Sequence, residues 1–176
     1  MSKAVIVIPA RYGSSRLPGK PLLDIVGKPM IQHVYERALQ EAGVAEVWVA
    51  TDDQRVEKAV QAFGGKAIMT RNDHESGTDR LVEVMHKVEA DIYINLQGDE
   101  PMIRPRDVET LLQGMRDDPA LPVATLCHAI SAEEATEPST VKVVVNTRQD
   151  ALYFSRSPIP YPRNAEKARY LKHVGI

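Results

Sequence analysis

The chain of 176 residues is long enough for one well-buried core but short for two, so we expect one domain covering 1–176. Lys and Arg number 22 against 24 Asp and Glu, and the resulting net charge of -2 argues against a nucleic-acid partner, which requires a basic surface. Residues 1–10 lack a signal-peptide pattern and no segment reaches the roughly 18 apolar residues of a membrane span, so we expect a cytoplasmic protein without a membrane partner.

The first predicted element is a strand at Ala4–Pro9, AVIVIP, an unbroken apolar run rich in β-branched residues. Such a run is typical of a strand that is covered on both faces. A loop rich in Gly, Ser and Pro follows. Apolar residues then recur at helical spacing over 30–42, and Gly43 supplies a C-terminal stop.

The alternation of strands and helices continues along the chain. Further strands are predicted at 46–51, 66–69, 92–96 and 122–129. Helices are predicted between them, starting after Asp52 or Asp53, at Ser76 and near Pro105. This order implies right-handed crossovers and therefore the α/β class, with a mostly parallel central sheet and helices on both faces.

The pattern changes after Ser131. Two adjacent strand candidates, 140–147 and 151–157, are joined by a short polar turn and followed by a Pro-rich, irregular stretch. This pattern indicates a small antiparallel arm at about 139–163, attached to the same domain. The single Cys127 lies in an apolar stretch, so we expect a buried, inert thiol.

Polar side chains collect after the predicted strands. Ligands bind at the carboxyl ends of strands in an open parallel sheet, because loops and helix N-termini converge there. The residues are Arg11, Ser14, Arg16 and Lys20 after the first strand, Asp52 and Asp53 after the second, and Gln97 and Asp99 after the fourth.

The first of these loops, ARYGSSRLPGK, combines cations with glycines that allow close backbone approach, which suits a polyphosphate. It is not a Walker P-loop, because Pro21 stands where Ser or Thr is required. Taken alone, it is equally consistent with a solvated turn.

The second loop, NLQGDEP, places Asp99 after a buried strand, where it suits Mg²⁺, an ion that prefers carboxylate and phosphate oxygens. An ordinary turn or helix-cap role is the alternative for Asp99 alone. A cationic loop and an acidic turn at one sheet edge together favour a metal-nucleotide site.

Several stretches between Lys3 and Ile176 resemble the 3-deoxy-manno-octulosonate (Kdo) cytidylyltransferase family. They are VIVIPARYGSSRLPGKPL, TDD, ESGTDR, NLQGDEP, FSRSPIPYPR and LKHVGI. The first is shared by many sugar nucleotidyltransferases, whereas the full set is specific to the Kdo branch. The resemblance implies transfer of CMP from CTP to the anomeric hydroxyl of Kdo for lipopolysaccharide or capsule synthesis, with Mg²⁺ as cofactor. It also implies a homodimer formed through the antiparallel arm.

The resemblance also implies roles for individual residues. The catalytic residues are Lys20, Arg11 and Asp99, of which Asp99 binds the metal. The nucleotide site comprises Arg11, Ser14, Arg16, Lys20, Ser76, Thr78 and Arg80. The sugar site comprises Gln97, Arg156 and His173, with Arg156 suited to the carboxylate of Kdo because an Arg fork binds carboxylates in two places. A surface role for Arg156 and a structural role for His173 are the alternatives.

Two other functions stay open: transfer to another sugar acid such as a sialic acid, and an inactive nucleotide-binding module. Members of the resembled family continue past KHVGI with a helical segment that carries a second acidic metal ligand. Since this sequence ends at Ile176, as a truncated piece or a natural short form, we expect residues 1–176 alone to turn over poorly.

Overall fold

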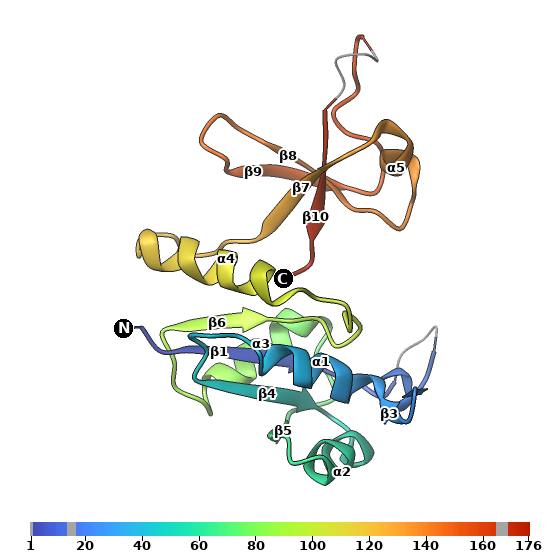
Figure 1. Cartoon of the computed structure of the whole chain (residues 1–176), viewed down its shortest axis with the longest axis vertical. Helices are drawn as coiled ribbons and strands as arrows, with labels where there is room; N and C mark the ends of the chain where they lie inside the picture. The colour runs from blue at the N-terminus through green and yellow to red at the C-terminus, as the bar shows by residue number, and fades with distance from the viewer. Residues whose placement is uncertain (1, 14–16, 165–168) are drawn as a thin grey trace. The chain divides into compact units, whose positions relative to one another are not determined.

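A computed structural model describes residues 2–13, 17–164 and 169–176 (Figure 1). The chain divides into two compact units, residues 1–124 with Ile176, and Thr125–Gly175. Within the described ranges, no helix is both long enough and apolar enough to cross a membrane. The expectation that 1–176 forms one domain stays a prediction.

The first unit is built on a parallel sheet with the strand order β5-β4-β1-β6. Its strands are β1 (Ala4–Pro9), β4 (Glu46–Thr51), β5 (Ala67–Met69) and β6 (Ile92–Asn95). In the central strand β1, Val7 pairs with Trp48 of β4 on one side and with Asn95 of β6 on the other. The prediction of an α/β fold with a parallel central sheet is confirmed, and each of these strands falls within one residue of its expected range.

Helices cover this sheet on both faces, as predicted. They are α1 (Met30–Ala38), α2 (Gln54–Ala62), α3 (Gly77–Met85) and α4 (Pro105–Asp117), with a short 3₁₀ helix η1 (Lys20–Leu22) and a small ribbon of β2 (Asp24–Ile25) and β3 (Lys28–Pro29). Figure 1 shows α1 in front of the sheet and α3 behind it. On the α3 side, Leu81 and Val84 pack against Val5 and Val7 of β1, which explains why β1 reads as apolar throughout.

The second unit is an antiparallel sheet with the strand order β7-β10-β8-β9. Its elements are β7 (Leu126–Ile130), α5 (Ala132–Thr136), β8 (Lys142–Val145), β9 (Ala151–Ser155) and β10 (Tyr170–Val174). The predicted hairpin of β8 and β9 is confirmed. The antiparallel sheet extends beyond 139–163, because β7 and β10 also pair in it. The strand expected at 122–129 within the alternating pattern of the parallel sheet is therefore β7 of the antiparallel sheet.

Two features of this unit differ from expectation. The segment 170–174 was not predicted as a strand, since Lys172 and His173 interrupt its apolar pattern; it becomes one by pairing with both β7 and β8. The prediction that Cys127 is buried is wrong, because its position on β7 leaves the side chain exposed in the described chain.

In the first unit, the connection between α1 and β4 packs against α4. The Nη2 atom of Arg116 donates to the carbonyl oxygen of Gly43 at 2.9 Å. Nearby, Glu41 is 8% exposed, and its Oε1 atom has no hydrogen-bond partner among the described residues. Burial raises the pKa of Glu41 from 4.5 to about 7, with further contributions from the charges of Glu109 and Asp107 on α4.

The raised pKa of Glu41 predicts a pH-dependent stability. The carboxyl group of Glu41 binds its proton more tightly in the folded state than in the unfolded state. Below pH 4.5 it is protonated in both states and does not lower the free energy of unfolding, whereas it lowers that free energy progressively as the pH rises from 4.5 to about 7. We expect Glu41→Gln to raise the free energy of unfolding at pH 8 by about 1–3 kcal/mol and to change it little near pH 4. Denaturant titrations at the two pH values measure this, and equal effects at both would contradict it.

Candidate active site

A pocket of about 530 cubic ångströms lies at the carboxyl ends of β1 and β6, where the sequence predicts the site. Arg11, Lys20, Gln97 and Asp99 all line it. Two further hollows, of about 170 and 400 cubic ångströms, adjoin this pocket, and Arg11 lines all three. The described loops after β1 and β6 therefore come together at one edge of the sheet.

Lys20 and Asp99 are in direct contact across this pocket. The Nζ atom of Lys20 donates to Oδ2 of Asp99 at 2.6 Å, although the residues are 79 positions apart. Their side chains are 35% and 50% exposed, and ion pairs this accessible contribute at most about 1 kcal/mol to stability. The pair therefore matters for what it presents to the pocket: an ammonium group and a carboxylate that both remain accessible to a ligand.

The backbone before Lys20 explains how its side chain reaches the pocket. Gly19 has a φ of +73°, a conformation that favours glycine, and its N–H donates to the carbonyl oxygen of Tyr12 at 2.8 Å. The Tyr12 ring lies so close to Gly19 that an added Cβ would meet it at 3.1 Å. Lys20 then begins η1, whose Pro21 is buried. The end of the cationic loop is thus held by the hydrogen bond from Gly19 to Tyr12 before Lys20 and by the buried Pro21 after it.

Glycines also allow other segments to approach the end of β1. A Cβ on Gly98 would lie 2.8 Å from the carbonyl oxygen of Pro9, and one on Gly77 would lie 3.0 Å from the Pro9 ring. The turn after β6 and the start of α3 therefore both press against Pro9. The close approach of Gly98 sets the position of its neighbour Asp99.

Gly98→Ala tests this close approach. The added methyl group meets a backbone oxygen that cannot rotate away, so we expect the free energy of unfolding to fall by about 1–3 kcal/mol. The control is Gly114→Ala in the interior of α4, where the Cβ meets open space and stability should rise by up to about 1 kcal/mol. Thermal melts of both variants provide the measurement, and an unchanged Gly98→Ala melt would contradict the packing.

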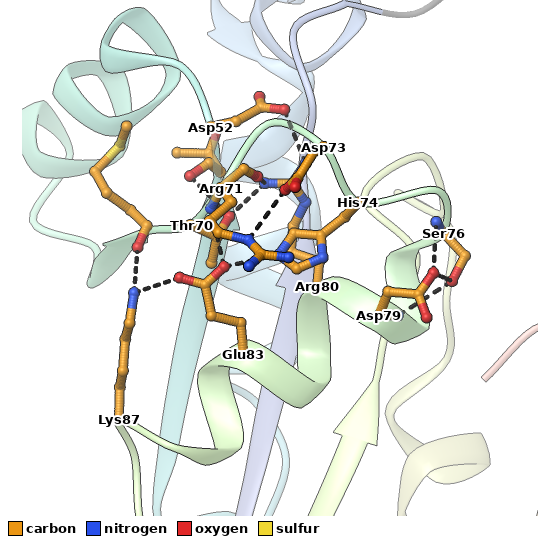
Figure 2. Close-up of polar contacts among 12 residues, drawn as sticks. Asp52, Thr70, Arg71, Asp73, His74, Ser76, Asp79, Arg80, Glu83 and Lys87 are labelled. Carbon is orange, nitrogen blue, oxygen red and sulfur yellow. Dashed lines mark hydrogen bonds and ion pairs between the residues drawn. The ribbon is translucent and has the colours of Figure 1, made fainter.

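Arg80, predicted in the nucleotide site, lines the two smaller hollows but is only 3% exposed. Its Nη2 donates to Oδ2 of Asp52 at 2.8 Å, and its Nη1 contacts Oγ1 of Thr70 and the carbonyl oxygen of Arg71 (Figure 2). Asp52, which follows β4, thereby supplies the counter-charge that a buried guanidinium needs. Asp53, the other candidate helix cap, is the residue that caps α2.

Ser76 and Thr78 stand at the start of α3, as predicted. The Oγ atom of Ser76 accepts from the N–H of Asp79, and the Asp79 carboxylate accepts from the Ser76 N–H, which is a capping box. Oγ1 of Thr78 accepts from Nδ2 of Asn95 at 3.4 Å. Ser76 lines the smaller hollow, of about 170 cubic ångströms, beside Arg80. The other two predicted nucleotide residues, Ser14 and Arg16, lie outside the described residues.

The predicted sugar residues are divided between the two units: Gln97 lies in the first, and Arg156 and His173 lie in the second. Nη1 of Arg156 donates to the carbonyl oxygens of Pro138 and Ser139, at 2.8 and 3.3 Å. Nε2 of His173 lies 2.9 Å from Oγ1 of Thr125, and burial lowers the pKa of the imidazole.

A buried lysine holds the turn around Arg156. Lys142 is fully buried, and its ammonium group donates to the carbonyl oxygens of Glu137, Thr140 and Arg156. This residue was not predicted from the sequence, although a lysine inside the β-branched run VKVVV was a visible signal. Asp52 was predicted as a polar residue after the second strand and as a possible helix cap, but no local feature of the sequence indicated its pairing with Arg80.

Lys142→Met keeps the length of the side chain but removes its donors. Three backbone carbonyls lose their partner, so we expect the free energy of unfolding to fall by about 2–4 kcal/mol. Lys58→Met, at an exposed position of α2, is the control and should change stability by less than about 0.5 kcal/mol. Urea titration measures both, and similar effects of the two substitutions would argue against the role of Lys142.

Comparisons with known proteins identify the class. A family model described as cytidylyltransferase matches residues 5–176. The chain is 97% identical over all its 176 residues to the 3-deoxy-manno-octulosonate cytidylyltransferase of Escherichia coli, of which it covers 72%. It is 50% identical over 181 aligned positions, 100% of the chain and 73% of the relative, to the enzyme of the same name from Syntrophus aciditrophicus (strain SB). The chain therefore belongs to the 3-deoxy-manno-octulosonate cytidylyltransferase branch of the cytidylyltransferase family.

Solved structures agree with this assignment. CMP:2-keto-3-deoxy-manno-octonic acid synthetase complexed with CTP matches with a TM-score of 0.95 and 97% identity, over 99% of this chain and 72% of that one. A cytidylyltransferase from Leptospira borgpetersenii matches with a TM-score of 0.60 and 24% identity, over 68% of this chain and 51% of that one. The second likeness shows the fold alone.

Proposed function

We propose that the chain transfers CMP from CTP to the anomeric hydroxyl of Kdo, releasing pyrophosphate. The observation that carries this proposal is the contact between Lys20 and Asp99 in the pocket that Arg11 and Gln97 also line. A cationic wall and an accessible carboxylate in one pocket suit a triphosphate and its metal ion. The 97% identity to a Kdo cytidylyltransferase supports Kdo as the acceptor.

In the proposed reaction, the anomeric oxygen of Kdo forms a bond to the α-phosphorus of CTP and loses its proton to solvent water. The bond from that phosphorus to the oxygen between the α- and β-phosphates breaks in line, and pyrophosphate leaves with that oxygen. Such reactions depend on positioning and charge stabilisation, since little covalent chemistry falls to the protein. Arg11 and Lys20 offset the charge on the phosphates, and Arg80 with Ser76 and Thr78 borders the nucleotide.

Asp99 is the proposed ligand of Mg²⁺. The described residues contain no cluster of three or more His, Cys, Asp or Glu that could enclose a metal ion. Mg²⁺ is suited to such a site, because it takes one or two carboxylates and completes its shell with phosphate oxygens and water. Bound there, Mg²⁺ would neutralise phosphate charge. Lys20 would then share the Asp99 carboxylate with the ion or turn to the phosphates.

The sugar acid is assigned to Gln97, Arg156 and His173. The carbonyl contacts of Arg156 use its Nη1 atom, so Nε and Nη2 are the donors that we assign to the Kdo carboxylate. The neutral amide of Gln97 and the imidazole of His173 suit hydroxyl groups.

We also propose a cytoplasmic homodimer formed through the arm. Leu152 and Tyr153 of β9 and the nearby Tyr161 are all more than 60% exposed, and apolar surface of this kind favours a partner.

Lys20→Ala and Asp99→Ala test the proposed chemistry. Each should lower pyrophosphate release with CTP, Kdo and Mg²⁺ by at least about 100-fold, because charge stabilisation at the phosphates is lost. The melting temperature should change by only a few degrees, since the ion pair is exposed. Lys58→Ala on α2 serves as the control. A full rate in either variant would contradict the assignment.

The same assay separates the alternative functions. An inactive nucleotide-binding module would be stabilised by CTP without releasing pyrophosphate. A transferase for another sugar acid would release pyrophosphate with a sialic acid in preference to Kdo.

A further inference from the structure

The connection from β5 to α3, residues 70–76, forms one wall of the proposed nucleotide site. His74 lines both of the hollows that adjoin the main pocket, beside Arg11 and Arg80. Asn72 lines the larger of the two. The position of this connection therefore determines the shape of the space next to Arg11.

One carboxylate fastens this connection to α3. Oε2 of Glu83 accepts from the N–H of Arg71 at 2.9 Å and lies 2.7 Å from Nε2 of His74, while Oε1 accepts from Nζ of Lys87 at 2.6 Å (Figure 2). The side chains of His74 and Glu83 are 8% and 19% exposed, so water competes little for these contacts. Lys87, the Arg71 N–H and His74 together lower the pKa of Glu83 to about 2, which keeps it charged at neutral pH.

Arg71 is held at both ends of its backbone. Its N–H binds Glu83, and its carbonyl oxygen accepts from Nη1 of Arg80. Arg80 and Glu83 lie three positions apart on α3, a spacing that places them on the same helix face. Helix α3 therefore binds the backbone of Arg71 through two side chains, the cationic Arg80 at the carbonyl oxygen and the anionic Glu83 at the N–H. A shift of the connection would move Arg80 as well as His74.

We propose that Glu83 is a positioning residue for nucleotide binding: by holding the Arg71 backbone and the His74 ring, it keeps His74 and Arg80 in place at the wall of the CTP site. Glu83 itself lines neither of the hollows next to Arg11, so its effect passes through these two residues. The inference rests on the proposed function, since it requires CTP to bind at this edge of the sheet.

Two substitutions of Glu83 separate its hydrogen bonds from its charge. Glu83→Gln retains an oxygen that can accept from both Arg71 and His74, but it loses the ion pair with Lys87. Glu83→Ala loses all these contacts. Lys87→Ala is the matched control, because it leaves both contacts between Glu83 and the connection while it removes the ion pair and the hydrogen bond from Lys87 to the carbonyl oxygen of Met69.

We expect Glu83→Ala to weaken CTP binding, measured by calorimetry below the melting temperature, by about 10-fold or more. Glu83→Gln and Lys87→Ala should each bind CTP within about 2-fold of the unsubstituted chain. Kdo affinity should be the same in all four proteins. A purely structural role for Glu83 would lower the melting temperature without this selective loss and without the rescue by Gln.

Equal CTP affinity in Glu83→Ala and the unsubstituted chain would overturn the inference while leaving the proposed function intact. Equal weakening in Glu83→Gln and Glu83→Ala would also overturn it, because Gln keeps the accepting oxygen. Failure of the unsubstituted chain to bind CTP would overturn the proposed function and the inference together. If Glu83→Ala does not fold, Glu83→Asp replaces it. Asp keeps the charge but reaches less far, and the same loss of CTP affinity is expected.

Discussion

The close approach of the turn after β6 and of the start of α3 to the end of β1 determines the arrangement of this edge of the sheet. Pro9 ends the central strand, and the turn after β6 passes so near its carbonyl oxygen that only a residue without a Cβ fits at position 98. Asp99 is the next residue, so the close approach of Gly98 to Pro9 determines where the backbone of Asp99 lies. Lys20, on the loop after β1, contacts the Asp99 carboxylate. The hydrogen bond from Gly19 to Tyr12 holds that end of the loop in place. A carboxylate and an ammonium group distant in sequence thus share one pocket.

The two ion pairs at this edge of the sheet, Lys20–Asp99 and Arg80–Asp52, differ in their exposure to solvent. The Lys20–Asp99 pair is accessible and adds little to stability, which suits groups that exchange partners when a ligand binds. The Arg80–Asp52 pair is buried, and removing either partner would leave an uncompensated charge. The first pair is therefore adaptable and the second rigid. In the proposed function, the Lys20–Asp99 pair would meet the polyphosphate, and the Arg80–Asp52 pair would hold the wall beside it.

The sequence alone predicted the α/β fold and the meeting of the loops after β1 and β6, because apolar runs and the topology of parallel sheets determine both. It did not predict contacts made by long side chains across the fold. Arg80 was placed near the nucleotide, but nothing local indicates that Asp52 and the backbone of Arg71 bind it. Strand β10 was missed because its pairing partners, β7 and β8, are distant in the sequence. Cys127 was expected to be buried because its neighbours are apolar, whereas Cys127, His128 and Ala129 are all exposed, so neither face of β7 is covered at its centre.

The buried ammonium group of Lys142 gathers three carbonyl oxygens, much as a coordinated alkali-metal ion would. Unlike such an ion, it is covalently tethered and cannot diffuse away. The turn that carries Arg156 is therefore organised by a cation whose occupancy does not depend on the ionic composition of the surrounding solution.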